Sequence, residues 1–224
     1  MKPVKRVLPY FALAVFTFAL FHSRDVKAYP KPNPSPVSWQ LDFQPGAPTR
    51  IAVKVPGSDA PKAYWYLPFT VTNNTNDEQE FLPVCELVDD NGKVHRSDEN
   101  IPAAVFDAIK QRENNKRFLE PLHKATGRIL VGPEQAKDTV AVWPEPLERM
   151  GSFSIFITGL SGEAVWYKDG KETPFNKADW TKMKPEDAGI ILRKTIELDY
   201  HVPGDEFYQG RDRVIKKDQR WVMR

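Results

Sequence analysis

The sequence predicts a mainly β protein, an antiparallel β-sandwich with one inserted α-helix. Segments that alternate apolar and polar side chains recur along the 224 residues, and a period of two is typical of strands with one buried face. Turn-forming residues separate these segments, and a single segment has helical spacing. About nine short strands without strand–helix alternation favour a sandwich over a parallel sheet.

Residues 1–28 are predicted to be a signal peptide. A basic start precedes the uncharged apolar run Leu8–Phe21, and the small residues Val26 and Ala28 precede the expected cleavage site. As a helix this run spans only ~21 Å, less than the ~30 Å hydrocarbon core of a bilayer. An uncleaved anchor is the alternative. We therefore expect a secreted protein, periplasmic or extracellular.

The charge of the mature chain argues against nucleic-acid binding. Residues 1–28 hold five of the 32 basic and one of the 30 acidic residues, so their removal leaves a formal charge of −2. The pI of 8.5 is largely a property of the removed peptide. A nearly neutral protein lacks the positive field that attracts nucleic acid or anionic lipid.

Residues 29–37 form a proline-rich spacer, with proline at every second position of YPKPNPSP. Proline fixes φ and lacks an amide donor, which predicts an extended, solvated segment. A disordered tail is the alternative. We assign residues 38–201 to the β-sandwich domain and residues 202–224 to a C-terminal basic strand or extension.

The first predicted strands are Ser38–Phe43, Arg50–Val55 and Tyr64–Thr72. In the third, Trp65, Leu67, Phe69 and Val71 share one face, and Tyr64 and Tyr66 lie on the other. Because Pro68 has no amide donor, we expect this strand at a sheet edge or with a bulge. The next strand is Phe81–Val88, and Asp90-Asn91-Gly92-Lys93 predicts a two-residue hairpin turn into Val94–Arg96.

One amphipathic helix interrupts the β pattern. Asn100 is its expected N-cap, and Pro102 falls in the first turn. Apolar residues then recur at helical spacing over roughly 12 to 14 residues, at Ile101, Val105, Ala108 and Ile109. We expect this helix to cover an open end or face of a sheet.

Strands resume after the helix and continue to the last residues. A hairpin is expected at Asp169-Gly170, since this pair favours a two-residue turn. Arg213–Met223 is expected to run antiparallel to Ile190–His201 across residues 202–212. The other predicted strands are Gly127–Val131, Thr139–Trp143, Ser152–Thr158, Val165–Lys168 and Lys171–Thr173.

Four segments resemble the immunoglobulin-like sandwich found in many exported bacterial proteins and lipoproteins, which are mostly of unknown function. They are FTVTNNT, FLPVCELVDDNGKVH, GRILVGPEQAKDTVAVWP and FSIFITGL, within Trp65–Leu160. The resemblance implies an immunoglobulin-like strand arrangement and a place in the cell envelope. The chain departs from that pattern in its Gly132-Pro133-Glu134 turn, its long Asp98–Thr126 insertion and the absence of a lipid-anchor cysteine.

The sequence contains no recognisable catalytic or metal-binding motif, so we expect no enzyme activity and no cofactor. The single Cys85 excludes a disulfide within the chain and lies in an apolar run, which predicts a buried thiol. The histidines lack the spacing of zinc ligands. The alternative is an envelope hydrolase or carbohydrate-active enzyme, in which Asp199 and His201 would share a cleft with Asp205 or Glu206.

The leading hypothesis is a non-enzymatic envelope protein with a binding or structural role. Candidate contacts with an envelope protein or glycan are the exposed face of Tyr64 and Tyr66 and the aromatic positions Trp143 and Trp166-Tyr167. Packing within the sheets is the alternative for these aromatics. We expect membrane contact only through an uncleaved signal or the basic C-terminus. The basic candidates for an anionic partner are Arg211, Arg213, Lys216, Lys217 and Arg220, with Trp221 among them.

Overall fold

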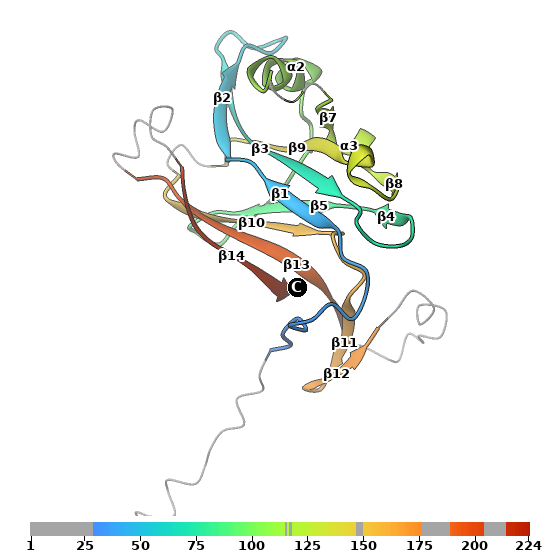
Figure 1. Ribbon diagram of the computed structural model, residues 1–224. Coiled ribbons are helices and arrows are strands. Elements are labelled where there is room, and N and C mark those ends of the chain that lie inside the picture. The colour runs from blue at the N-terminus through green and yellow to red at the C-terminus, as the bar shows by residue number, and fades with distance from the viewer. Residues whose placement is uncertain (1–28, 115, 117, 147–149, 176–188, 204–213) are drawn as a thin grey trace, which may run out of the picture. The chain divides into compact units, whose positions relative to one another are not determined.

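The computed structural model describes residues 29–114, 116, 118–146, 150–175, 189–203 and 214–224, so the predicted signal peptide lies outside the described residues. Residues 31–224 form one compact unit. The unit is mainly β, and most of its strands pair antiparallel in two sheets that pack as a sandwich (Figure 1). None of the helices among the described residues is long and apolar enough to cross a membrane.

The five-stranded sheet is built around the long strand β3 (Lys62–Thr72). On one side β3 pairs with β1 (Asp42–Pro45) and β2 (Thr49–Val53), and on the other side with β9 (Lys137–Pro144). The short β7 (Glu120–Pro121) adds to β9 in parallel orientation. β3 is therefore a central strand.

The seven-stranded sheet is built around β13 (Ile190–His201). β10 (Ser152–Thr158) pairs with the C-terminal half of β13, and β11 (Ala164–Lys168) pairs with its first residues. β14 (Ile215–Met223) also pairs with β13, antiparallel as predicted, so this strand belongs to the sandwich. The remaining strands of this sheet are β5 (Val84–Val88), β6 (Val94–Arg96) and β12 (Lys171–Pro174).

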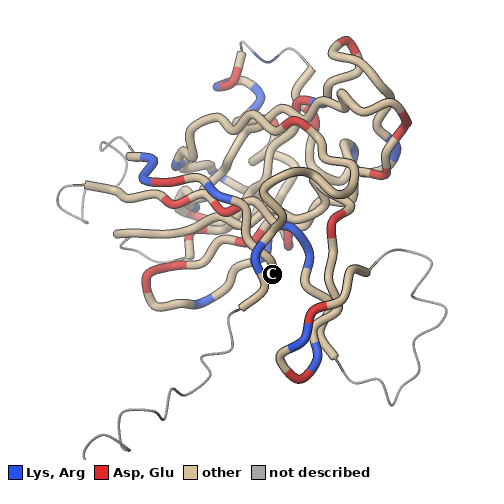
Figure 2. The backbone as a smooth tube through the Cα atoms, turned by 60° about the horizontal axis from the view of Figure 1, so that its bottom comes forward, with Lys and Arg blue, Asp and Glu red and all other residues tan. Residues whose placement is uncertain are grey.

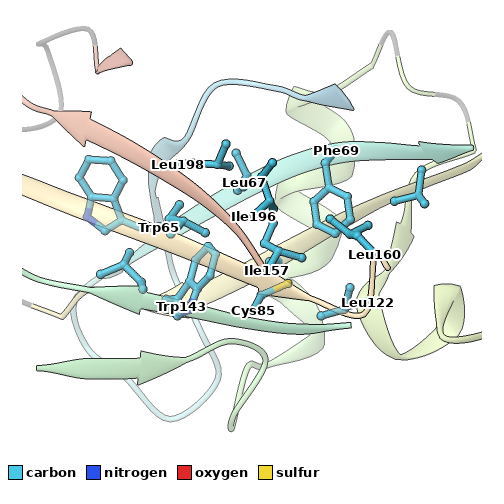
Figure 3. Packing of buried hydrophobic residues seen from close by; sticks show 14 of the residues in the cluster. Trp65, Leu67, Phe69, Cys85, Leu122, Trp143, Ile157, Leu160, Ile196 and Leu198 are labelled. Carbon is cyan, nitrogen blue, oxygen red and sulfur yellow. The ribbon is translucent and has the colours of Figure 1, made fainter. Parts of the chain in front are cut away.

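The main hydrophobic core lies between the two sheets (Figure 3). The predicted inward face of β3 is confirmed, and its side chains pack with apolar side chains of β5, β10 and β13. Cys85 is buried in this cluster, as predicted, and burial raises the pKa of its thiol. The inward residues of β3 and β9 are Trp65, Leu67, Phe69, Val71, Ala141 and Trp143.

A second hydrophobic cluster covers the opposite face of the five-stranded sheet. There the inserted helix α2 (Ala103–Arg112) places Val105 and Ile109 against Val140 and Val142 of β9. The five-stranded sheet is thus covered on both faces, which explains why β3 is buried at consecutive positions. The prediction that the helix covers a sheet face is confirmed.

Pro68 lies in the middle of a central strand, so the predicted edge position is wrong. The predicted alternative was a bulge, and the register does shift by one residue between β1 and β2, opposite Leu67 and Pro68. β1 ends opposite Phe69, and β2 begins opposite Tyr66. The carbonyl oxygen of Pro68 accepts a hydrogen bond from the Gly46 amide (2.7 Å), in the interruption between β1 and β2. Because the amide and carbonyl of a strand residue point to the same side, the donor that proline lacks would face this interruption.

Two other local predictions are wrong. Phe81–Val88 is not one strand: β4 (Gln79–Phe81) pairs with β8 (Gly127–Ile129) in a separate two-stranded sheet, and β5 begins at Val84. Asn100 does not cap α2, because it has a left-handed φ of 56° and the helix begins after Pro102 without a side-chain cap. A short helix α3 (Leu122–Ala125) and a 3-10 turn η2 (Pro133–Gln135) were not predicted.

Both predicted hairpins form, but only one has the predicted turn. Asp169 and Gly170 have φ angles of 50° and 79° and join β11 to β12 as a two-residue turn, as predicted. Between β5 and β6 the loop is longer. The Asp89 amide donates to the Lys93 carbonyl, the Gly92 amide donates to the Asp89 carbonyl, and Val88 faces Val94.

Gly159 follows β10 and packs closely against the Leu82 backbone, so a substitution there tests this packing. Its φ is +83°, and a Cβ there would lie 2.3 Å from the Leu82 carbonyl oxygen. We expect Gly159→Ala to lower the free energy of unfolding by more than about 3 kcal/mol, because steric overlap adds to backbone strain. Urea denaturation measures this change.

Gly57→Ala is the matched control, because Gly57 has a φ of +78° and nothing lies within 4 Å of a Cβ there. This variant should lose only the roughly 1–2 kcal/mol of left-handed strain. Equal losses in the two variants would show that the contact with Leu82 does not constrain position 159.

Candidate functional site

The two predicted contact tyrosines of β3 are buried, so their expected exposure is wrong. Tyr64 is 5% exposed and Tyr66 is 0% exposed, because α2 and its flanking residues cover this face. The Tyr66 hydroxyl donates to Glu113 Oε1 at 2.8 Å, beside the C-terminus of α2. Burial and this hydrogen bond raise the pKa of Tyr66. Trp143 is also fully buried, with its indole N–H donating to the His95 carbonyl oxygen.

The predicted basic strand is only partly available to a partner. Arg211 and Arg213 lie outside the described residues. In β14, Lys216 and Lys217 are exposed, whereas Trp221 is half-buried and packs against the main core.

Arg220 of β14 is occupied by carboxylates of its own sheet. It lies 2.7 Å from each of Glu197, Asp199 and Asp218. Acidic and basic positions also alternate over the described backbone rather than forming one basic region (Figure 2). The structure therefore leaves Lys216 and Lys217 as the accessible cations among the predicted residues of β14.

β14 is also poorly suited to pair with a further strand. Among the described residues it pairs only with β13, so its other edge is not paired. The register with β13 shifts at Asp199/Tyr200, where Lys217 forms a bulge. Lysines and bulges are features that protect edge strands from pairing with other chains.

Asp199 and His201 lie on the outer face of the seven-stranded sheet, each beside a serine of β10. The Ser154 hydroxyl donates to Asp199 Oδ1, and the Ser152 hydroxyl lies 3.1 Å from His201 Nδ1. Asp205 and Glu206, the other members of the hydrolase hypothesis, lie outside the described residues. The hydrolase alternative therefore stays a prediction.

Asp89 is a structural carboxylate. Its Oδ1 accepts hydrogen bonds from the Asn91 and Lys93 amides, both at 3.0 Å, and its Oδ2 lies 2.8 Å from His95 Nε2. Burial opposes ionisation, but these hydrogen bonds outweigh it and lower the pKa of Asp89. Within the described residues, no group of three or more histidine, cysteine or acidic side chains is placed to hold a metal ion.

Asp98 combines a left-handed backbone with a buried carboxylate oxygen. Its φ is 62°, although it is not glycine, and its Oδ2 is buried without a hydrogen-bond partner. Burial raises the pKa of Asp98 to about 6, even though hydrogen bonds from the Ser97 hydroxyl and the Val142 amide favour the charged form. The sequence placed Asp98 only at the start of an insertion, with no sign of its burial.

A buried ion pair joins β13 to the segment before β11. Lys194 Nζ lies 2.9 Å from Glu163 Oε2, and both side chains are 3% exposed. The other carboxylate oxygen accepts hydrogen bonds from the backbone amide (2.8 Å) and side-chain amide (3.0 Å) of Asn33. Burial opposes ionisation of Glu163, but the contacts with Asn33 and Lys194 lower its pKa. The predicted solvated spacer is therefore attached to the domain at Asn33.

A partly exposed apolar surface lies on a three-stranded ribbon, which we define as β11, β12 and residues 190–193 of β13. On one face Tyr167 lies opposite Ile190, and Val165 lies opposite Leu192. Ile190 is 58% exposed, and Val165 and Tyr167 are half-buried. The ribbon lies at the end of the domain opposite α2 (Figure 1).

No family model, curated protein or solved structure matches this chain. The resemblance to the immunoglobulin-like domains of exported bacterial proteins thus stays a prediction.

The pKa of Asp98 predicts a pH-dependent gain from Asp98→Asn. Because the folded pKa of about 6 is above the ordinary aspartate pKa of 3.8, ionised Asp98 destabilises the fold, and this loss develops as pH rises from about 4 to 6. At pH 7.5 Asp98→Asn should raise the free energy of unfolding by on the order of 2 kcal/mol, with little effect at pH 3.5. Asparagine also tolerates the left-handed φ.

Urea denaturation at both pH values measures this effect. Asp59→Asn, at an exposed position, controls for the loss of one negative charge. The same gain at pH 3.5 and pH 7.5 would contradict the assignment of Asp98 as a carboxylate that ionises near pH 6.

Loss of the Glu163 charge should destabilise the fold strongly. Glu163→Gln leaves the Lys194 ammonium buried without its carboxylate and should lower the free energy of unfolding by about 3–5 kcal/mol. The double variant Glu163→Gln/Lys194→Met should recover much of this loss, since neither charge is then buried. Thermal and urea denaturation measure both variants.

The exposed pair of Arg128 and Glu78 is the control, with side chains 74% and 48% exposed. Glu78→Gln should change stability by less than about 1 kcal/mol. An equally small effect of Glu163→Gln would mean that water reaches Lys194 in solution.

Proposed function

We propose that this protein is an exported, non-enzymatic β-sandwich that binds a partner in the cell envelope, either a protein or a glycan, through its ribbon. The observation that carries the proposal is the partly exposed apolar face of Val165, Tyr167 and Ile190. The signal-peptide pattern of residues 1–28 supports export, and the resemblance to envelope domains supports the location.

The ribbon has the physical properties of a contact surface. Tyrosine supplies a large and rigid contact area at little entropic cost, and such side chains contribute most of the energy of many interfaces. The charged residues Lys168, Asp169, Lys171 and Glu172 lie at the end of β11, in the turn and on β12, next to this face (Figure 2). An apolar centre with a polar rim is the usual composition of a protein interface.

The alternative surface is the exposed pair Lys216 and Lys217 of β14, which would bind an anionic group. Salt bridges already occupy Arg220, so the remaining charge is small. We therefore favour the ribbon.

Site-specific crosslinking in the native host tests the proposal. A photoreactive phenylalanine analogue replaces Tyr167, Lys217 or Lys110 in the full chain, and the crosslinked product is identified in envelope fractions. We expect one defined adduct at Tyr167 and none at Lys110, which lies on α2 at the opposite end of the domain (Figure 1).

An adduct at Lys217 without one at Tyr167 would assign binding to the basic strand instead. If the protein remains with the cytoplasmic fraction, or no position gives an adduct, the proposed envelope function is wrong. Ile190→Ser should reduce the yield at Tyr167 by about fivefold or more, because the loss of an apolar contact of this size costs about 1 kcal/mol or more.

A further inference from the structure

The N-terminal residues Asn33–Leu41, which we call the strap, lie along the segment that joins β10 to β11. The Leu41 amide donates to the Leu160 carbonyl oxygen (2.8 Å), and the Gly162 amide donates to the Trp39 carbonyl oxygen (3.0 Å). The Ser161 hydroxyl also donates to the Trp39 carbonyl oxygen (3.1 Å). Leu41 is 1% exposed and belongs to the main core.

The strap and this segment are closely fitted. A Cβ at Gly162 would lie 2.4 Å from the indole nitrogen of Trp39 and 2.5 Å from the Ser38 hydroxyl oxygen. A side chain larger than that of glycine at position 162 would therefore push the strap away from this segment.

The strap also completes the buried ion pair. Lys194 binds one oxygen of the Glu163 carboxylate, and Asn33 supplies two donors to the other oxygen. A buried carboxylate is stable only when its oxygens are bonded. If the strap leaves, Glu163 Oε1 loses both of these hydrogen bonds and meets water instead.

These contacts lie where the ribbon joins the sandwich. Glu163 directly precedes β11, and Lys194 directly follows the part of β13 that pairs with β11. The Lys194 amide donates to the Glu163 carbonyl oxygen (2.9 Å), and the Lys194 ammonium lies 5.4 Å from the ring centroid of Trp221. The ion pair thus fixes the base of the ribbon, and Asn33 holds the ion pair.

The first part of the strap is held at few points. Pro34 and Pro36 have no amide hydrogen, so only Asn33 and Ser35 can donate from the backbone in residues 33–36. Residues 33–37 are exposed. The polar contacts of Asn33 with Glu163 are the hydrogen bonds that attach residues 33–36 to the domain.

We propose that the strap is a releasable brace for the ribbon: its contact with Glu163 and Lys194 keeps the ribbon in its binding position, and its release loosens the ribbon. This inference rests on the proposed function of the ribbon and adds its regulation. Whatever acts on the strap, such as a protein that binds its proline-rich sequence, would thereby change binding at Tyr167 without touching it.

Hydrogen exchange of the full chain tests the brace. Asn33→Ala removes the side-chain donor, and Asn33→Pro removes the backbone donor as well while keeping the segment extended. Ser35→Pro is the matched control, because it adds the same ring at a strap position for which the structure records no hydrogen bond. Amide exchange is then compared between residues 164–174 in the ribbon and β3 in the core.

We expect ribbon amides to exchange about tenfold faster in Asn33→Pro. The reason is that a hydrogen bond to a charged group changes an equilibrium constant by on the order of tenfold. Asn33→Ala should have a smaller effect, and Ser35→Pro and the β3 amides should show no change. The brace is overturned if strap residues 38–41 lose protection while the ribbon keeps it. It is equally overturned if β3 loses protection as much as the ribbon, because the effect would then be global.

The crosslinking yield at Tyr167 in the same variants separates this inference from the proposed function. A ribbon that loosens in Asn33→Pro supports the brace even where Tyr167 gives no adduct, and that absence counts only against binding at the ribbon. An adduct whose yield is unchanged although the ribbon has loosened overturns the regulatory part of the inference.

Discussion

The burial of both faces of the β3–β9 pair is the constraint on which the rest of the domain depends. One face forms the main core with the seven-stranded sheet, and the other packs against α2. A strand in this position cannot alternate apolar and polar residues, because each face must exclude water. Tyr66 is buried on the face that α2 covers. Its ring excludes water there, and its hydroxyl is hydrogen-bonded to Glu113. The inserted helix is thus a second covering layer, without which the aromatic face of β3 would be exposed.

Local sequence signals predicted the parts of this architecture that depend on neighbouring residues. The period of two placed Trp65 and Phe69 in the core, and Asp169-Gly170 gave the turn between β11 and β12. Tertiary context decided the other cases. Pro68 reads as an edge residue from sequence alone, but an interruption in its partner strand makes it acceptable in a central position. Asn100 reads as a helix cap, yet it adopts a left-handed turn before α2.

The charged groups of the interior could not be predicted in this way. Lys194 falls in a strand whose alternation places it on the inward face, yet lysine in a strand usually reaches water. Its partner Glu163 is 31 positions away, and Asn33 is a further 130 positions from Glu163. No sequence spacing encodes such a contact. Asp98 likewise gave no local signal, because Val142 and His123, which lie near its carboxylate, are distant in the sequence. By contrast, the sequence did indicate Trp166-Tyr167 as an aromatic contact candidate, and this segment is partly exposed. The same signal also selected Tyr64 and Tyr66, which are buried, so it does not separate surface aromatics from core aromatics.

The position of the strap in the sequence has a consequence for the order of assembly. The strap leaves the ribosome before nearly all of the domain, but the groups that hold it at Leu160–Glu163 and Lys194 are made much later. Contacts between such distant residues form late, because a long loop must be closed first. The N-terminal segment therefore stays unpaired while most of the sandwich is being completed. During that interval its prolines keep its first part extended and leave few backbone donors there, which limits mispairing with the unfinished sheet edges.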